Sequence, residues 1–227
     1  MKTRGERQYI NMPLFGARLY DNLTHIKGVN KGFDEIAEFI THRLERGELL
    51  DIGTGPGRLL DAISQKNPKL GLFGLDISKS MIAVAGKNLK NVQNVDLRVG
   101  NIVKTEFQSD YFDAILCTGS FYNWDSPVEG LNEVFRILKS GKTAYFFETT
   151  KDYDEKLLNE RLGANLQGYP FLRRRLSKYF LNKQLRMTYT NQEFDKIILQ
   201  TEFRESYKIE PVELGDLPIY LRIELRK

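Results

Sequence analysis

The sequence predicts an α/β domain built on a doubly wound sheet of seven strands, mostly parallel with an antiparallel last strand. Short apolar runs alternate with amphipathic helical segments along most of the chain, and a glycine cluster follows the first of these runs. Strands that alternate with helices form parallel sheets through right-handed crossovers, with ligands at the carboxyl ends of the strands. The 227 residues suit a single domain, 1–227, with a modest insertion.

An amphipathic helix, followed by strand, helix, strand and helix, is expected within residues 31–88. Residues 31–48 predict an amphipathic helix that Gly47 ends, with its apolar face made of Phe33, Ile36, Ala37, Ile40 and Leu44. Residues 48–52 then predict a buried strand that enters a glycine loop, and the renewed apolar pattern of Leu59, Leu60 and Ile63 predicts a helix.

A second strand at 71–76 ends in an acid, and the helix at 78–88 has Ser78 as its expected N-cap. The sheet is expected to continue through strands at 95–99, 112–118 and 143–148.

A helix at 126–139, ended by Gly141, precedes the fifth strand, and a last helix is expected at 190–201. Strands at 207–213 and 219–226 complete the sheet, the second of them antiparallel.

Two further segments lie outside this alternating pattern. Residues 150–184 are interpreted as a helical insertion that forms a lid over the substrate cleft, and residues 1–30 as an N-terminal cap segment.

The net charge of +4 comes from one basic stretch. Residues 171–188 contain six Lys or Arg and no acid, and the rest of the chain has 28 basic against 30 acidic residues. This stretch could contact an anionic substrate, a membrane surface or nothing at all, and no recognisable RNA-binding module accompanies it. Nucleic acid is therefore not the expected partner.

Composition also bears on compartment and metals. Cys117 is the only cysteine, so an internal disulfide is excluded and no Cys/His cluster can hold zinc; no metal site is predicted. No run of about 18 apolar residues suggests a membrane span, and residues 1–8 are charged without an apolar run behind them. A cytoplasmic protein is expected.

The glycine loop separates two cofactor classes. Glycines after a strand let a ligand approach backbone N–H groups at a helix N-terminus. A dinucleotide loop places its third glycine at the sixth position, where this chain has Arg58; its glycines are Gly53, Gly55 and Gly57, and Asp51 precedes them. This Asp-x-Gly-x-Gly-x-Gly segment resembles motif I of the seven-stranded, class I methyltransferases that use S-adenosylmethionine (SAM). Another nucleotide and a merely structural glycine turn stay open as alternatives.

The resemblance spans roughly residues 30–148 and implies a Rossmann-like fold. Asp76 stands where the family's acid binds both ribose hydroxyls, and Asn101 stands where the loop facing adenine usually has Asp; the amide oxygen can still accept a hydrogen bond. Residues 112–117 resemble motif IV. Residues 131–142 resemble the family's helix and Lys-Pro-Gly-Gly turn, of which only Gly141 remains.

The resemblance implies a site for SAM, with S-adenosylhomocysteine (SAH) as its product. The cofactor-binding residues that it suggests are Tyr20, Asp51, Gly53, Thr54, Gly55, Gly57, Asp76, Ile77, Met81, Asn101, Ile102, Cys117 and Thr118.

Tyr20-Asp21 and the loop 120–124 resemble the small-molecule branch, which includes methyltransferases of quinone biosynthesis. The acceptor is accordingly expected to be a small molecule, and an anionic one if the basic stretch faces it. Its expected contacts are Tyr122, Trp124, Arg173 and Arg174. For Trp124, packing under the loop is an equally weighted alternative.

Methyl transfer needs an acceptor held in line with the sulfonium methyl group and a route for its proton. Candidate proton acceptors are His25, Tyr122 and Glu148, although His25 also fits an ordinary solvated loop residue. Two alternative functions remain: an RNA methyltransferase that uses the basic insertion, and a SAM-binding protein without catalysis. The sequence does not decide the acceptor or the oligomeric state.

Overall fold

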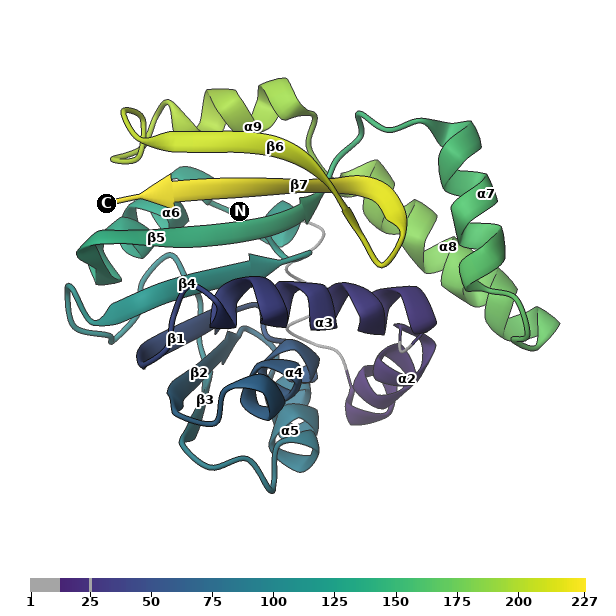
Figure 1. Cartoon of the computed structure of the whole chain (residues 1–227), viewed down its shortest axis with the longest axis horizontal. Coiled ribbons are helices and arrows are strands. Elements are labelled where there is room, and N and C mark those ends of the chain that lie inside the picture. The colour runs from purple at the N-terminus through teal and green to yellow at the C-terminus, as the bar shows by residue number, and fades with distance from the viewer. Residues whose placement is uncertain (1–12, 25) are drawn as a thin grey trace.

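The computed structural model describes residues 13–24 and 26–227. Its centre is one sheet of seven strands in the order β3-β2-β1-β4-β5-β7-β6 (Figure 1). The strands are β1 (Gly47–Ile52), β2 (Leu70–Asp76), β3 (Val95–Val99), β4 (Phe112–Thr118), β5 (Leu138–Thr149), β6 (Tyr207–Leu214) and β7 (Leu217–Arg226). β7 is antiparallel to both β5 and β6, and the other neighbouring pairs are parallel. The predicted doubly wound sheet with an antiparallel last strand is confirmed.

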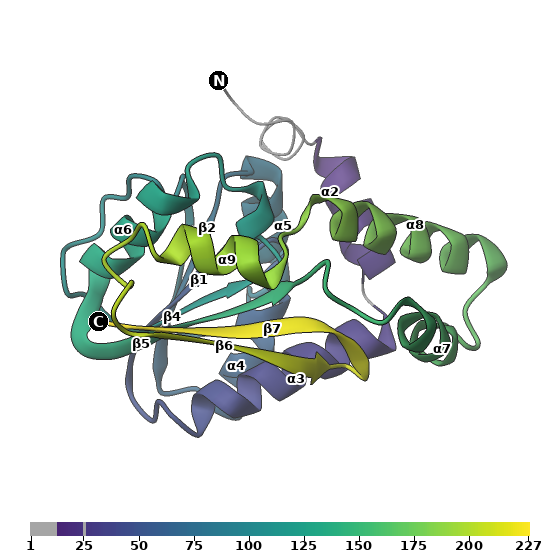
Figure 2. The same ribbon diagram turned by 90° about the horizontal axis from the view of Figure 1, so that it is seen from above.

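Helices cover both faces of the sheet, as Figure 2 shows. On one face lie α3 (Lys27–Thr41), α4 (Arg58–Lys66) and α5 (Lys79–Asn88), whose apolar sides form one core cluster with the strands. On the other face lie α6 (Pro127–Ile137) and α9 (Asn191–Ile198), which pack in a second cluster. Because both faces are buried, the central strands are almost continuously apolar.

Two predicted helix ends were wrong. The helix predicted at 31–48 is α3, which ends at Thr41, and Gly47 instead opens β1 with φ +128°, where a Cβ would lie 2.4 Å from a carboxylate oxygen of Asp113. The helix predicted at 126–139 ends at Ile137. Gly141, with φ +76°, lies inside β5 and donates its N–H to the carbonyl of Lys227. Gly47 begins a strand and Gly141 lies where the register of β5 against β4 shifts, so neither glycine ends a helix.

The N-cap predicted at Ser78 is confirmed, because a cap depends on neighbours in sequence. The Ser78 hydroxyl accepts from the backbone N–H of Met81 at the start of α5, as expected. At the start of α9, Thr190 and Glu193 form a reciprocal capping box.

Three helices gather beyond the carboxyl ends of the central strands (Figures 1 and 2). They are α2 (Leu14–Thr24), α7 (Glu155–Asn165) and α8 (Phe171–Met187). The insertion 150–184 thus contains α7 and most of α8, which pack with the start of β7 in a small separate cluster. α2 packs against α5 through Ala17, Met81 and Val84. Within residues 13–24 and 26–227, none of the helices combines the length and apolar character that crossing a membrane requires.

Candidate active site

The glycine loop begins where β1 ends, at the carboxyl edge of the sheet. Gly53 and Gly55 have φ of +71° and +52°, a backbone conformation that favours glycine. A Cβ on Gly53 would lie 2.3 Å from the hydroxyl oxygen of Ser120, whereas one on Gly55 would have no atom nearer than 3.9 Å. Gly53 therefore packs against the loop after β4, and Gly55 leaves its backbone open to the cleft.

Two carboxylates lie beside this loop. Asp51 is buried at the end of β1, and burial raises its pKa to about 7, a rise that the Thr54 side chain opposes and the nearby Asp76 increases. Asp76 accepts from the N–H groups of Gly55 and Ser78, both at 2.8 Å. Burial raises the pKa of Asp76 as well, and these two hydrogen bonds oppose the rise. A cationic ligand in the cleft would favour the ionised forms of both carboxyl groups.

The first compartment of the cleft lies beside Asp76 and combines polar groups with apolar walls. Its lining is Tyr20, Ile52, Gly53, Gly55, Leu75, Asp76, Ile77, Met81, Gly100, Asn101, Ile102, Gly119, Ser120, Tyr122, Asn123 and Trp124. Trp124 packs on the buried ring of Phe121, with centroids 4.8 Å apart. A Cβ on Gly130 of α6 would lie 2.6 Å from the Trp124 ring, so the glycine makes room for it. Trp124 both packs under the loop and reaches the cleft.

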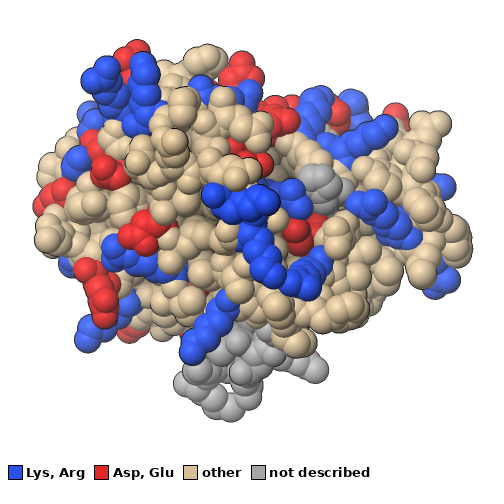
Figure 3. Space-filling model, turned by 90° about the horizontal axis from the view of Figure 1, so that it is seen from below, with Lys and Arg blue, Asp and Glu red and all other residues tan. Residues whose placement is uncertain are grey.

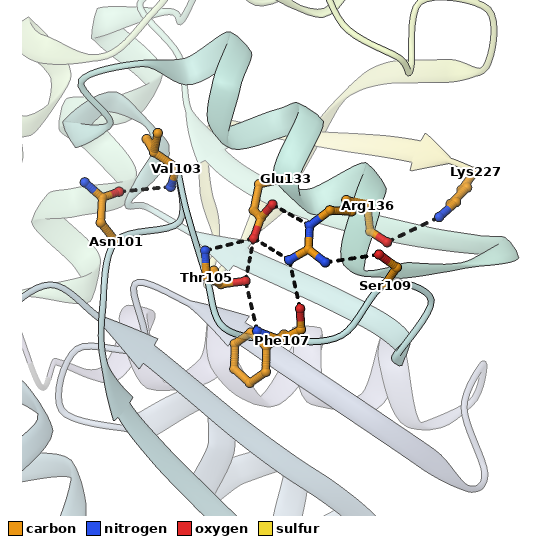
Figure 4. Close-up of polar contacts among 8 residues, drawn as sticks. All are labelled: Asn101, Val103, Thr105, Phe107, Ser109, Glu133, Arg136 and Lys227. Atoms are coloured by element: carbon orange, nitrogen blue, oxygen red, sulfur yellow. Dashed lines mark hydrogen bonds and ion pairs between the residues drawn. The ribbon is translucent and has the colours of Figure 1, made fainter.

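The loop after β3 forms one wall of this compartment, and a polar network fixes it to α6 (Figure 4). Glu133 accepts from the N–H of Thr105 at 2.8 Å and from its hydroxyl at 2.6 Å. Arg136 donates to Glu133 at 2.7 Å and to the carbonyl of Phe107 at 2.8 Å. Burial alone would raise the pKa of Glu133, but these hydrogen bonds outweigh it and hold the pKa below its usual value.

Asn101 has a local role that the sequence did not reveal. Its side-chain oxygen accepts from the backbone N–H of Val103 at 3.0 Å, which closes a tight turn (Figure 4). The same residue lines the cleft, and an amide oxygen has a second lone pair with which to accept.

Glu148 holds the loop after β4 from beneath. It is fully buried and accepts from the N–H groups of Ser120 and Phe121 at 3.1 and 3.2 Å and from the thiol of Cys117 at 3.2 Å. Burial raises the pKa of Glu148 to about 7, against the effect of these hydrogen bonds. This geometry makes Glu148 a positioning residue for the loop.

A second compartment continues from the glycine loop toward α3 and β7. Its lining is Tyr20, Asp21, Thr24, Gly28, Val29, Asn30, Gly32, Phe33, Ile36, Asp51, Gly53, Thr54, Gly55, Pro56, Arg58, Leu59, Thr118, Gly119, Gln184, Leu214 and Tyr220. Asp21 of α2 pairs with Arg58 of α4 through two hydrogen bonds of 2.8 and 2.9 Å. This bidentate pair fixes α2 beside the glycine loop.

A third cavity opens between α2, α8 and β7, and its walls are mostly apolar. It is lined by Gly16, Leu19, Tyr20, Leu23, Thr24, Ile26, Val29, Tyr122, Leu162, Ser177, Phe180, Leu181, Lys183, Gln184, Met187, Leu217 and Tyr220. Tyr20 lines all three spaces, and Tyr122 lines the first and the third. The three spaces therefore share walls at the carboxyl edge of the sheet.

Most of the residues expected at the site come together around these compartments. The ones that line them are Tyr20, Asp51, Gly53, Thr54, Gly55, Asp76, Ile77, Met81, Asn101, Ile102, Thr118, Tyr122 and Trp124. Others lie outside this lining: Gly57 is the N-cap of α4, and Cys117 is buried beneath the Ser120 loop. His25 lies outside the described residues.

The two arginines expected to contact the acceptor do not line the cleft. Arg173 donates to the backbone carbonyl of Asn22 at 2.8 Å and stacks on Tyr169, and Arg174 is exposed. The direction in which a helical side chain points depends on how the helix docks, so a contact of either arginine with the acceptor stays a prediction. Of the basic residues 171–188, Lys183 lines the third cavity, and Arg186 lines a separate pocket beside Lys151 and Glu155.

Sequence reasoning also missed several cleft residues. Tyr220 lines the second and third compartments, and burial, with Glu148 nearby, raises its pKa to about 12. Gln184 reaches the same two compartments from α8. Both residues belong to segments without a motif. One member of the Asp21–Arg58 pair was noticeable in the sequence, because Arg58 stands where a dinucleotide loop has glycine. Its partner Asp21 is 37 residues away, so the pair itself could not be predicted.

Comparisons with known proteins agree with this geometry. Residues 50–146 match a family model described as a methyltransferase domain. An uncharacterized methyltransferase, YdaC, of Bacillus subtilis is 26% identical over 44% of this chain and 56% of its own length. A demethylmenaquinone methyltransferase of Chlorobaculum parvum is 27% identical over 65% of this chain. The chain spans 56% and 62% of the length of these two curated relatives.

A solved structure extends the similarity to nearly the whole chain. It is a Methanococcus maripaludis protein assigned as a SAM-dependent methyltransferase, with 25% identity and a TM-score of 0.70. The superposition covers 96% of this chain and 94% of that one. The similarity includes the segments outside 50–146, so the helices beyond the sheet edge are part of a shared architecture.

Proposed function

We propose that this chain, which belongs to the class I family of SAM-dependent methyltransferases, transfers the methyl group of SAM to a small molecule with an apolar body. The observation that carries the proposal is the sharing of walls between the cleft and the cavity. Tyr20 and Tyr122 border both the carboxylate-rich compartment and the apolar cavity. Two reactants placed in these spaces would meet at their common walls.

The donor groups of the first compartment suit SAM. Asp76 offers carboxylate oxygens beside apolar Ile77, Met81 and Ile102, a combination that fits a polar ribose next to a flat base. The space beside the Cα of Gly55 and the buried carboxyl of Asp51 suit the charged amino-acid end. When bound, SAM supplies an electrophilic methyl carbon, whose bond to sulfur breaks as the acceptor's lone pair attacks and leaves SAH.

The residues of the chain act mainly by positioning. Glu148 holds the 119–124 loop through backbone N–H groups, and the Asp21–Arg58 pair holds α2 in place. Tyr122 is the described proton-acceptor candidate that borders both spaces. With its pKa raised to about 12, Tyr220 would donate a hydrogen bond and not remove a proton.

Two segments outside the methyltransferase motifs border the cleft. Residues 1–227 would act as one domain in which the described part of 1–30, residues 13–24 and 26–30, caps the cleft and 150–184 close the acceptor side; residues 1–12 and 25 lie outside the described residues. The described helices of the two segments, α2, α7 and α8, line the apolar cavity through residues such as Leu19, Leu162 and Phe180. A closing segment at this place would exclude water from the reaction.

The acceptor's chemical class follows from the lining of the cavity. Leu23, Ile26, Leu181 and Leu217 present apolar surface, and Lys183 and Gln184, neighbours on α8, supply polar atoms. The Chlorobaculum parvum relative is named for demethylmenaquinone, a small molecule. We therefore expect an apolar acceptor with one polar end.

Binding and transfer can be tested separately. Titration calorimetry should show SAM and SAH binding, and Asp76→Asn should weaken both by roughly 10- to 100-fold, the range for hydrogen bonds to a charged group. Asp96→Asn, an acid of the neighbouring strand that pairs with Arg98 at 2.7 Å, is the matched control and should bind normally. Equal loss in both variants, or no SAM binding, would contradict the cofactor assignment.

Transfer is then measured with methyl-labelled SAM and a panel of apolar, aromatic and anionic small molecules, scored by mass spectrometry. The expected result is labelled product from an apolar acceptor. SAM binding with no labelled product from any acceptor would make the chain a SAM-binding protein without catalysis.

A further inference from the structure

Exposed apolar side chains concentrate on the two helices that border the apolar cavity. Among the described residues, eight large hydrophobic side chains are exposed, and six of them belong to α2 and α8: Leu14, Phe15, Leu19, Phe171, Leu172 and Tyr179. Phe171 and Leu172 begin α8, at the end of the α7–α8 hairpin that projects from the right-hand end of the molecule in Figure 1; they are 73% and 67% exposed. Large apolar groups gathered on a protruding element mark an interaction surface.

The same helices carry uncompensated positive charge. α8 contains no acid, and the one acid of α2, Asp21, is buried and paired with Arg58. Arg174 and Arg175 are exposed, and neither has an acidic partner within 4.0 Å in the described part of the chain. In Figure 3 the right-hand end of the molecule shows more Lys and Arg than Asp and Glu.

Apolar and basic groups are interleaved on one side of α8. Phe171, Arg175 and Tyr179 follow one another at intervals of four residues, so they share the outward face of the helix. The guanidinium carbon of Arg175 lies 5.8 Å from the centre of the Phe171 ring. The inward face carries Ser177 and Leu185, which are buried. α8 therefore has a packed side and an outward side that is both apolar and cationic.

We propose that the outward face of α8, together with the exposed apolar residues of α2, binds the surface of an anionic lipid bilayer. Apolar side chains would enter the boundary between headgroups and acyl chains while Arg174, Arg175 and Lys178 face the lipid phosphates. This is peripheral binding by helices that already belong to the folded domain.

Charge favours a bilayer over a second copy of this chain. A symmetric dimer through this face would bring the two uncompensated basic clusters together, and repulsion would oppose it. Contact with a bilayer would also place the apolar cavity beside the lipid. Leu19 is 44% exposed on the outside of α2 and also lines the cavity. An apolar acceptor dissolved in the membrane would pass from lipid to cavity along apolar surface.

Lipid binding needs no methyl transfer, so it can be measured on the full chain without SAM. Vesicles of phosphatidylcholine alone and of phosphatidylcholine with about 30% phosphatidylglycerol are sedimented with the protein. We expect binding to the anionic vesicles that is at least tenfold stronger than to the neutral ones and that weakens with added salt.

Two variants separate the components of the surface. Arg174→Gln/Arg175→Gln/Lys178→Gln should lower the partition coefficient on anionic vesicles by roughly 100-fold, and Phe171→Ser/Leu172→Ser by at least tenfold. The matched control is Val99→Ser/Leu199→Ser, which removes the two exposed large hydrophobic side chains that lie on other elements. It should bind as the unmodified chain does, and circular dichroism and melting temperature should show that all variants are folded.

Three results would overturn the proposal. The first is no binding to anionic vesicles, or equal loss in the control. The second is light scattering that shows a dimer which Phe171→Ser/Leu172→Ser dissociates, since the occupant would then be a second copy. The third is binding that depends on the basic residues alone and is matched by single-stranded RNA, since the surface would then recognise polyanions in general.

Discussion

The two sides of the cleft are held together in different ways. Around Asp76 and the loop after β3, carboxylates accept from backbone N–H groups: Asp76 from Gly55 and Ser78, and Glu133 from Thr105. Around the apolar cavity, side chains of α2, α7 and α8 meet mainly through apolar packing, in the cluster that includes Leu162 and Leu217. Hydrogen bonds therefore determine the structure of the cofactor side, and apolar packing determines that of the acceptor side.

This difference teaches where substrate specificity can change. Hydrogen-bonded backbone tolerates little substitution, because a lost partner leaves a buried polar group unsatisfied. An apolar wall can exchange side chains of similar volume at small cost. The match to the methyltransferase family model accordingly covers residues 50–146, which contain the glycine loop and Asp76 but neither α2 nor α8.

Gly53→Ala is expected to have the largest effect and to act on the cofactor side. Its φ of +71° disfavours a side chain, and the new Cβ would lie 2.3 Å from Ser120 Oγ. Strain and overpacking together should lower the free energy of unfolding by roughly 2 to 5 kcal/mol and abolish measurable SAM binding. Chemical denaturation and calorimetry measure both quantities.

The matched control is Gly163→Ala on α7, where a Cβ meets nothing within 4 Å. It should raise the free energy of unfolding by roughly 0.5 to 1 kcal/mol, since Ala favours the helix. A harmless Gly53→Ala would show that the glycine loop is adaptable and would remove the contrast between the two sides.

Asp51→Asn should alter pH dependence. Burial raises the pKa of Asp51 from 3.8 to about 7 in the folded chain, so the folded state binds more protons than the unfolded state between these values. Its contribution to stability is therefore lost as pH rises from about 4 to about 7, by on the order of a few kcal/mol. The variant should flatten this part of the curve, measured by denaturation at several pH values.

SAM carries a net positive charge and should favour the ionised form of Asp51, so its affinity should rise with pH and level off above about 7. Asp51→Asn should lose that rise. Glu148→Gln is the informative comparison, since Glu148 has a pKa of about 7 but lies outside the cleft lining. It should flatten part of the stability curve yet keep the pH dependence of SAM binding; loss of both would tie Glu148 to the cofactor.

Leu181→Ala tests the acceptor side. Leu181 lines the apolar cavity only, so truncation should remove binding that ground state and transition state share. We expect KM for an apolar acceptor to rise about tenfold, with kcat and SAM affinity nearly unchanged. Leu199→Ala, at an exposed leucine that lines none of the described cavities, should leave KM unaltered. A drop in SAM affinity in Leu181→Ala would show that the two sides are not separable.

Arg174→Ala/Arg175→Ala should have the smallest effect. Both side chains are exposed and line none of the described cavities. In the absence of lipid, SAM affinity and KM for a water-soluble acceptor should stay within about twofold of the unmodified chain, as is usual for surface substitutions. A clear rise in KM for an anionic acceptor would return these arginines to the acceptor pocket.

The sequence by itself determined the order of strands and helices, the N-cap at Ser78 and the glycine loop with its two carboxylates. These features depend on neighbours in the chain: apolar periodicity, and motifs such as Asp51 before Gly53. Helix ends were predicted less accurately, because Gly47 and Gly141 belong to strands, where they contact the distant residues Asp113 and Lys227.

Only the tertiary structure decided which residues far apart in the sequence share a wall. It brought Tyr220 and Gln184 to the cleft, paired Asp21 with Arg58, and turned Arg174 outward. It also placed Glu148 beneath the loop and not in the cleft. The physical reason is that the direction of a side chain on α8 or β7 depends on how the whole element docks, and docking sums many apolar contacts that no local pattern records.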